Sequence, residues 1–175
     1  MASPGVEALL YLMDEAFEGR GIEESNESQA LLTNLATVSE EQWQAKPPGA
    51  ERTIAWMVVH LGTCKLMYDD YAFGSRSLFW DQPGVQPWPE HQAPMAETLA
   101  WLRDAQARLR SHIAELDDSE LDRPRMTNWG EERPTRWIIA MLISHDSYHA
   151  GEINHLRSLL SGDDRWNYVR ELEGG

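Results

Sequence analysis

Apolar residues recur at steps of three and four along much of the chain, which is the spacing of helices that bury one face. The first such stretch covers roughly residues 5–18. A shorter apolar stretch runs from Leu31 to Val38, and residues 39–42 then read Ser-Glu-Glu-Gln, the form of a capping box that opens one more short turn. Two helical segments and one further short turn are therefore expected before residue 47.

Three more segments follow the same spacing. One runs to about Phe73 from Thr53, whose hydroxyl can cap its first turn. Another covers roughly residues 95–116 with a heptad spacing broken by Gln106, and the last reaches about residue 160 from a second predicted cap at Thr135. Because no β-type alternation of useful length appears, the pattern predicts an all-α four-helix bundle.

Proline and glycine separate these helices. Residues 47–49 read Pro-Pro-Gly and force a loop, and residues 74–94 form a long loop rich in proline and aromatic residues between the second and third long helices. Phe79, Trp80 and Trp88 are candidate walls of a substrate pocket in this loop, although packing is the favoured interpretation. Residues 123–134 are expected to form another loop. Three arginines of this loop and one at the start of the next helix are expected to balance surface charge rather than bind an anion. They are Arg123, Arg125, Arg133 and Arg136.

Composition limits the classes of function. A chain of 175 residues with 42% hydrophobic content predicts one domain over residues 1–175, with the last ten or so residues as a tail. The net charge of −14 argues against binding to nucleic acid or to anionic membranes. A single cysteine excludes an intramolecular disulfide, and neither an export signal nor a membrane span is apparent, so a cytoplasmic protein is expected.

The candidate chemistry lies in three histidines. His145 and His149 are four residues apart and share one face of the last helix, and the other residues of that face are apolar. His60 lies on the second long helix. Spacing alone allows two interpretations of the pair, hydrogen-bonded core histidines or metal ligands. Adding His60 gives three neutral imidazoles, a donor set that suits a divalent metal and leaves a coordination position open.

Other residues near these positions have competing interpretations. Cys64 lies one turn after His60 and can reach an ion there, but a lone helical cysteine is more often a small buried apolar residue, which is the favoured interpretation. Glu152 follows His149 by three residues and is a candidate fourth ligand, general base or orienting acceptor. The remaining histidines, His91, His112 and His155, are expected at the surface.

Several motifs resemble the DinB-like superfamily of metal-binding four-helix bundles. VSEEQW at residues 38–43, KPPG at 46–49 and TIAWMVVHL at 53–61 look like its first-helix end and second helix. HDSYHAGEI at residues 145–153 is similar to its last-helix signature of two spaced histidines followed by a small residue, glycine and a polar residue. Only the two ends and the aromatic loop lack a match.

The resemblance implies a metal, commonly zinc or nickel, bound by His60, His145 and His149. Many members have glutamine where this chain has Glu152, so the role of this carboxylate stays open. Characterised members that this chain resembles use the metal to activate a low-molecular-weight thiol such as mycothiol, bacillithiol or glutathione. The family name implies no binding to DNA.

The expected function is therefore metal-dependent transfer of a small thiol to an electrophile, in detoxification or a stress response. One alternative is a stress-response protein that binds a metal or an apolar ligand without turnover. Another is a metal-dependent hydrolase with Glu152 as the base that activates water. The apolar faces of the first and third long helices also make a homodimer plausible.

Overall fold

The computed structural model describes residues 3–19, 30–80 and 86–162, and the predicted C-terminal tail lies outside this part of the chain. Its elements are α1 (Pro4–Phe17), α2 (Leu31–Leu35), α3 (Glu40–Trp43), α4 (Ile54–Phe73), α5 (Met95–Ala114), a 3-10 turn (Asp118–Glu120), β1 (Pro124–Met126), β2 (Glu132–Pro134) and α6 (Thr135–Ser161). The four long helices agree with the predicted ones to within two residues at each end, and the all-α bundle is confirmed. Among the described residues, no helix is long and apolar enough to cross a membrane.

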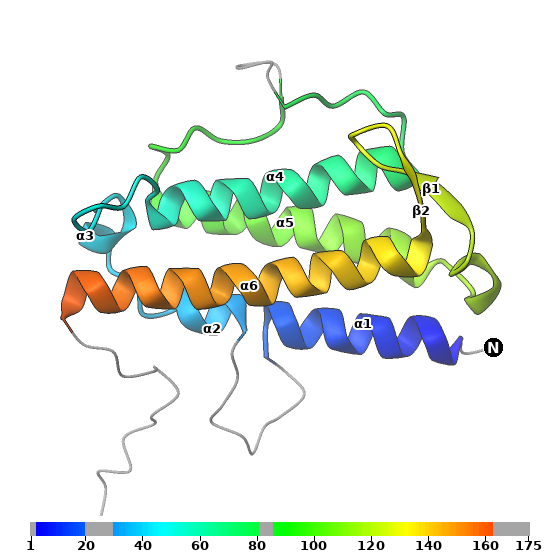
Figure 1. The fold of residues 1–175 in the computed structure, drawn as a ribbon, viewed down its shortest axis with the longest axis horizontal. Coiled ribbons are helices and arrows are strands. Elements are labelled where there is room, and N and C mark those ends of the chain that lie inside the picture. Colours follow the sequence, from blue (N-terminus) through cyan, green and yellow to red (C-terminus); the bar gives the residue numbers. More distant parts are fainter. Residues whose placement is uncertain (1–2, 20–29, 81–85, 163–175) are drawn as a thin grey trace, which may run out of the picture.

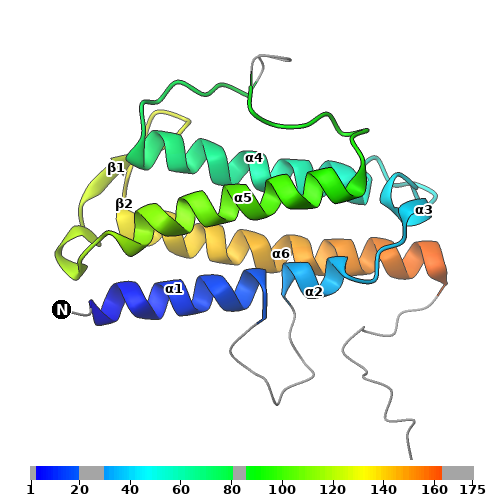
Figure 2. The same cartoon turned by 180° about the vertical axis from the view of Figure 1, so that it is seen from behind.

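The long helix α6 is in contact with most of the bundle. α4 packs along one side of α6, while α1 and α2 follow each other along another side (Figure 1). α5 packs mainly on α4 and also contacts α1, as the reverse view shows (Figure 2). The short helix α2 thus continues the line of α1, so that the two together cover the length of α6 that one longer helix would cover.

Two clusters of buried apolar side chains form the core. On α4, Leu61 belongs to one cluster and Cys64 to the other. On α6, Ala150 belongs to the cluster of Leu61 and Leu142 to the cluster of Cys64. The segment of the α4–α6 interface that carries the histidines therefore lies where the two clusters meet, and apolar packing on either side holds it in place.

The structure confirms two of the three predicted helix caps. Ser39 and Gln42 form a full capping box, and the Thr53 hydroxyl accepts a hydrogen bond from the backbone of Trp56. The prediction for Thr135 is wrong, because this residue is the first of α6 and Pro134 is the cap position. Side-chain capping is not needed there, since the Thr135 backbone N–H donates to the carbonyl of Arg123.

The segment predicted as the loop 123–134 contains a short antiparallel hairpin. β1 and β2 pair with Arg125 opposite Arg133, and each strand has three residues, too few for an alternating pattern to reveal. Arg123, Arg133 and Arg136 pair with nearby carboxylates, as the charge-balance interpretation expects. Arg125 also pairs with a carboxylate, that of Glu120, but its guanidinium is largely buried. It donates in addition to the carbonyl of Ala72, which ties the hairpin to the end of α4.

Buried ion pairs join α4 to its neighbours. Lys65 on α4 donates to both oxygens of Asp146 on α6 at 2.7 and 2.6 Å, and both residues are 1% exposed. Asp69 on α4 is fully buried, and its carboxylate oxygen Oδ1 lies 2.5 Å from Nδ1 of His112 on α5. The His112 side chain is 37% exposed, so it lies at the surface as predicted, but its ring also contacts a buried carboxylate, which the sequence did not predict. His91 and His155 are exposed, as expected.

The loop after α4 is anchored at both ends. Asp70 is buried, and its carboxylate accepts backbone N–H groups from Ser75, Ser77 and Leu78. These bonds hold the pKa of Asp70 below its usual value, although burial opposes them.

The second anchor is Trp101 of α5, whose indole N–H donates to the carbonyl of Pro87 at 2.7 Å. The Trp101 ring packs on Gly62 of α4, where a Cβ would meet the ring at 2.2 Å. This close approach requires glycine.

Replacing Gly62 with alanine should lower the free energy of unfolding. Overpacking costs about 1–3 kcal/mol, while the better helix propensity of alanine returns up to about 1 kcal/mol. Gly151→Ala on α6 is the matched control, because a Cβ there meets nothing within 4 Å and should stabilise the protein. Chemical denaturation measures both, and equal stability of the two variants would contradict the packing argument.

Candidate metal centre

Helices α4 and α6 bring together the three histidines identified from the sequence. Nε2 of His60 lies 3.3 Å from Nε2 of His145, which lies 3.0 Å from Nε2 of His149. The His60 and His149 ring centroids are 5.2 Å apart. The i, i+4 spacing on α6 places its two rings on one face, and the packing of α4 against that face places the third ring opposite them.

These separations fit a divalent metal. Metal–nitrogen bonds of about 2.0–2.1 Å at tetrahedral angles put two nitrogen ligands about 3.4 Å apart. The observed 3.3 Å is close to this value and 3.0 Å is slightly shorter. Nε2 of an uncharged imidazole carries either one hydrogen or one lone pair. His145 therefore cannot form well-aligned hydrogen bonds to both neighbours, whereas a cation between the rings satisfies every lone pair.

The surroundings keep the rings uncharged. Burial, together with the charge of a neighbouring protonated His149, lowers the pKa of His60 to about 4 and that of His145 to about 3. Burial also lowers the pKa of His149, although Glu152 opposes the shift. Metal ions bind neutral imidazole, so the donor set is ready for an ion at neutral pH.

Cys64 lies beside this group. Its Sγ is 3.7 Å from Nε2 of His60, and the donor atoms of His60, Cys64 and His145 all lie within 4.8 Å of one another. The residue is also 6% exposed and packs in an apolar cluster, as the sequence interpretation expects. Burial raises the pKa of the thiol to about 12, so without a cation the sulfur is protonated at neutral pH.

Glu152 lies on the outer side of His149. Its Oε2 is 2.6 Å from Nδ1 of His149, which is an ion-pair distance. The contact between these two atoms does not have the geometry of a hydrogen bond. The other carboxylate oxygen, Oε1, accepts a hydrogen bond from the hydroxyl of Tyr148 at 3.0 Å. The carboxylate thus faces the nitrogen of His149 that points away from the other histidines.

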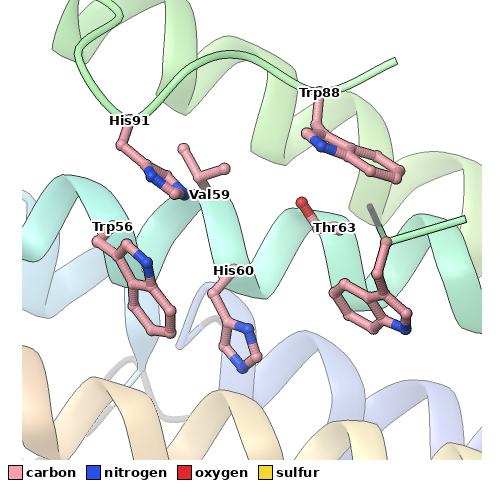
Figure 3. Close-up of a pocket in the computed structure, with 7 residues that line it drawn as sticks. Trp56, Val59, His60, Thr63, Trp88 and His91 are labelled. Carbon is pink, nitrogen blue, oxygen red and sulfur yellow. The ribbon is translucent and has the colours of Figure 1, made fainter. Parts of the chain in front are cut away.

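A cavity of about 230 Å³ opens beside His60, between α4 and the loop that crosses it. Trp56, His60 and Thr63 line it from α4, while Trp88 and His91 line it from the loop (Figure 3). Val59 and Trp80 complete the lining. The cavity is predominantly apolar and aromatic, with one candidate ligand in its wall.

Aromatic stacking fixes the His60 ring. Its centroid is 5.2 Å from the ring of Trp56 and 6.5 Å from that of Trp80, with interplanar angles of 11° and 24°. Trp80 and Trp88 thus line the cavity, whereas Phe79 does not. The sequence did not connect His91 with this site, because no spacing rule relates a loop residue to a ring on α4.

The fold and the side chains define an all-α bundle with a candidate metal centre of histidine and cysteine between two of its helices. A family model of the DinB superfamily matches residues 25–153, which is most of the chain. The protein therefore belongs to the DinB superfamily. A comparison with curated proteins finds no match.

The metal-free protein should contain histidines that stay neutral in mild acid. NMR titration should give ring pKa values of about 4 for His60 and about 3 for His145, against about 6.5 for an unstructured histidine. Because the folded values are lower, the unfolded chain takes up protons first, and stability should fall as the pH drops from about 6.5 toward about 4. Midpoints near 6.5 for both rings would contradict the buried arrangement.

Proposed function

We propose that the protein is a metal-dependent enzyme that activates a low-molecular-weight thiol for transfer to an electrophile. The observation that carries the proposal is the convergence of three imidazoles at the α4–α6 interface, with one of them in the wall of an aromatic cavity. A buried donor set next to an open cavity suits chemistry on a bound molecule better than it suits purely structural metal binding.

His60, His145 and His149 would hold the ion, for which zinc and nickel are the candidates. When bound, such an ion lowers the pKa of a thiol or a water in its open position, which makes the thiolate nucleophile available near neutral pH. The three ligands are uncharged, so they leave the positive charge of the ion undiminished. The cavity has His60 in its wall, so a small molecule bound there would lie next to one of the three ligands.

Glu152 is best explained as the group that orients His149. Its carboxylate faces Nδ1 at 2.6 Å, and a hydrogen on that nitrogen leaves the Nε2 lone pair directed toward the other histidines. The hydroxyl of Tyr148 holds the second carboxylate oxygen in place. This position favours the orienting role over those of a fourth ligand or a base for water, since Nδ1 of His149 points away from the other rings.

The cavity walls indicate what the electrophile is like. The walls offer the ring faces and edges of Trp56, Trp80 and Trp88 to a small apolar or flat molecule. The cavity volume of about 230 Å³ limits the size of that molecule. The exposed imidazole of His91 adds one polar group at the loop side of the cavity. We infer a small, largely apolar electrophile rather than a highly charged one.

Hydrolysis with Glu152 as base, and binding without turnover, remain the competing functions. Hydrolysis requires product to form without any thiol, and simple binding requires uptake of a metal or ligand with no product at all. A cytoplasmic location accords with the thiol chemistry, because reducing compartments keep small thiols and the lone Cys64 reduced.

The proposed activity predicts loss of thiol that depends on both metal and electrophile. Zinc- or nickel-loaded protein should consume mycothiol, bacillithiol or glutathione with a model electrophile, while chelated protein should not. His60→Ala, His145→Ala and His149→Ala should each lose stoichiometric metal and the activity. His155→Ala is the matched control, because this histidine is exposed on the same helix, and it should retain both. A loaded protein that consumes no thiol in the panel, or forms product without thiol, would contradict the proposal.

Glu152→Gln should weaken metal binding while leaving the fold intact. Loss of an outer-shell carboxylate typically costs about 10–100-fold in affinity for the metal. Competition with a chromophoric chelator measures this change, and Tyr148→Phe, which removes only the bond to Oε1, should have a smaller effect. Unchanged affinity in the Glu152 variant would show that the carboxylate does not orient the ligand.

A further inference from the structure

One arginine near the candidate metal centre differs from most others in the molecule. Most arginines in the described part of the chain pair with carboxylates, as Arg123 and Arg136 do, but no carboxylate in that part pairs with Arg52. Arg52 directly precedes the cap residue of α4, and its side chain is exposed. The chain as a whole carries a net charge of −14, so it repels anions at long range. An unpaired cation in such a protein favours the binding of an anion at the place where it lies.

Stacking holds this guanidinium beside the histidines. The Cζ atom of Arg52 lies 4.4 Å from the ring centroid of Trp56, and the Trp56 ring stacks on that of His60 with centroids 5.2 Å apart. One indole ring thus connects the guanidinium with a candidate metal ligand. A stacked guanidinium uses its flat face for the contact, so the N–H groups at its edge stay available to a carboxylate.

The charge of Arg52 acts on both helices of the site. Burial is the main cause of the low pKa values of His60 and His149, and the charge of Arg52 contributes to both shifts. The hydrogen bond to Glu152 raises the pKa of Tyr148, and the charge of Arg52 opposes this rise. The carboxylate of Glu152 is itself engaged with His149 and Tyr148. The guanidinium therefore lies where groups from α4 and from α6 are both within its electrostatic range.

We propose that Arg52 binds a carboxylate of the thiol co-substrate, so that the site selects anionic thiols over uncharged ones. The inference rests on the thiol chemistry of the proposed function and names the class of thiol. Glutathione and bacillithiol carry carboxylates, whereas mycothiol has none. The first two are therefore the expected co-substrates.

The position of Arg52 assigns the carboxylate to the thiol rather than to the electrophile. The cavity that suits the electrophile has mainly aromatic walls, and Arg52 is not among the residues that line it. A carboxylate in such a cavity would lose its hydration without gaining a cationic partner. A thiol that reacts at the histidines can instead extend past Trp56 to the guanidinium, which lies one indole ring away from His60.

Two model thiols that differ only in charge test the assignment. N-acetylcysteine carries a carboxylate and its amide does not, so comparison of the two isolates the contribution of the anion. The protein is the zinc-loaded full-length chain with one neutral electrophile, and the variants are Arg52→Gln and Arg52→Lys. Arg103→Gln is the matched control, because this exposed arginine of α5 lines a different cavity, between α1 and α5. Isothermal titration with each thiol, without electrophile, measures binding independently of turnover.

The wild type and the Arg103 variant should favour N-acetylcysteine over its amide. Arg52→Gln should raise KM and Kd for N-acetylcysteine about tenfold, as expected for the loss of a charge-assisted hydrogen bond. It should change kcat little, and it should leave both constants for the amide nearly unaltered. Arg52→Lys should keep part of the preference, because an ammonium retains the charge but not the planar fork.

The outcomes separate this inference from the proposed function. Equal use of both thiols by the wild type, or an equal loss for both thiols in Arg52→Gln, would overturn the role of Arg52 and leave thiol transfer standing. If the wild type consumes no thiol but binds N-acetylcysteine in a way that depends on Arg52, the anion site stands and thiol transfer fails. Absence of both turnover and binding would overturn both.

Discussion

The site depends on one constraint, the fixed packing of α4 against α6. His60 and the pair His145 and His149 come from segments 85 residues apart, and they meet only if the two helices keep one register. The buried ion pair of Lys65 and Asp146 fixes that register, because each partner follows a donor residue directly in the sequence. Removing one partner of a buried pair leaves an unpaired charge in the core, at a typical cost of about 3–5 kcal/mol. The apolar clusters on either side then hold the interface in place.

The same helix, α4, also supports the cavity. Its end is tied to the following loop by Asp70, and the return of that loop is held by Trp101 over Gly62. Aromatic side chains thus lie on both sides of His60, Trp56 from α4 itself and Trp80 from the anchored loop. Because the ligand ring and the cavity wall are parts of one packed unit, a molecule in the cavity is necessarily close to the donor set.

Much of this was predictable from the sequence because helical periodicity is a strong local signal. The four long helices, the capping box at Ser39 and the histidine face of α6 all follow from residues within a few turns of one another. The hairpin was missed because strands of three residues leave no pattern, and the cap at Thr135 failed because a distant carbonyl replaces it. The partners of Lys65 and Asp69 could not be predicted, since only tertiary contact reveals the partner of a buried charge. The approach of His91 to the site was equally non-local, whereas the closeness of Cys64 to His60 follows from their spacing of four residues.

The central claim is that one divalent cation is shared by imidazoles from two helices. Anomalous diffraction from crystals of zinc-loaded protein, collected on both sides of the zinc edge, tests it most directly. The account predicts one strong peak per chain, within about 2.0–2.1 Å of ring nitrogens from His60, His145 and His149. A peak elsewhere, or histidine rings that remain hydrogen-bonded to one another with no peak between them, would contradict it.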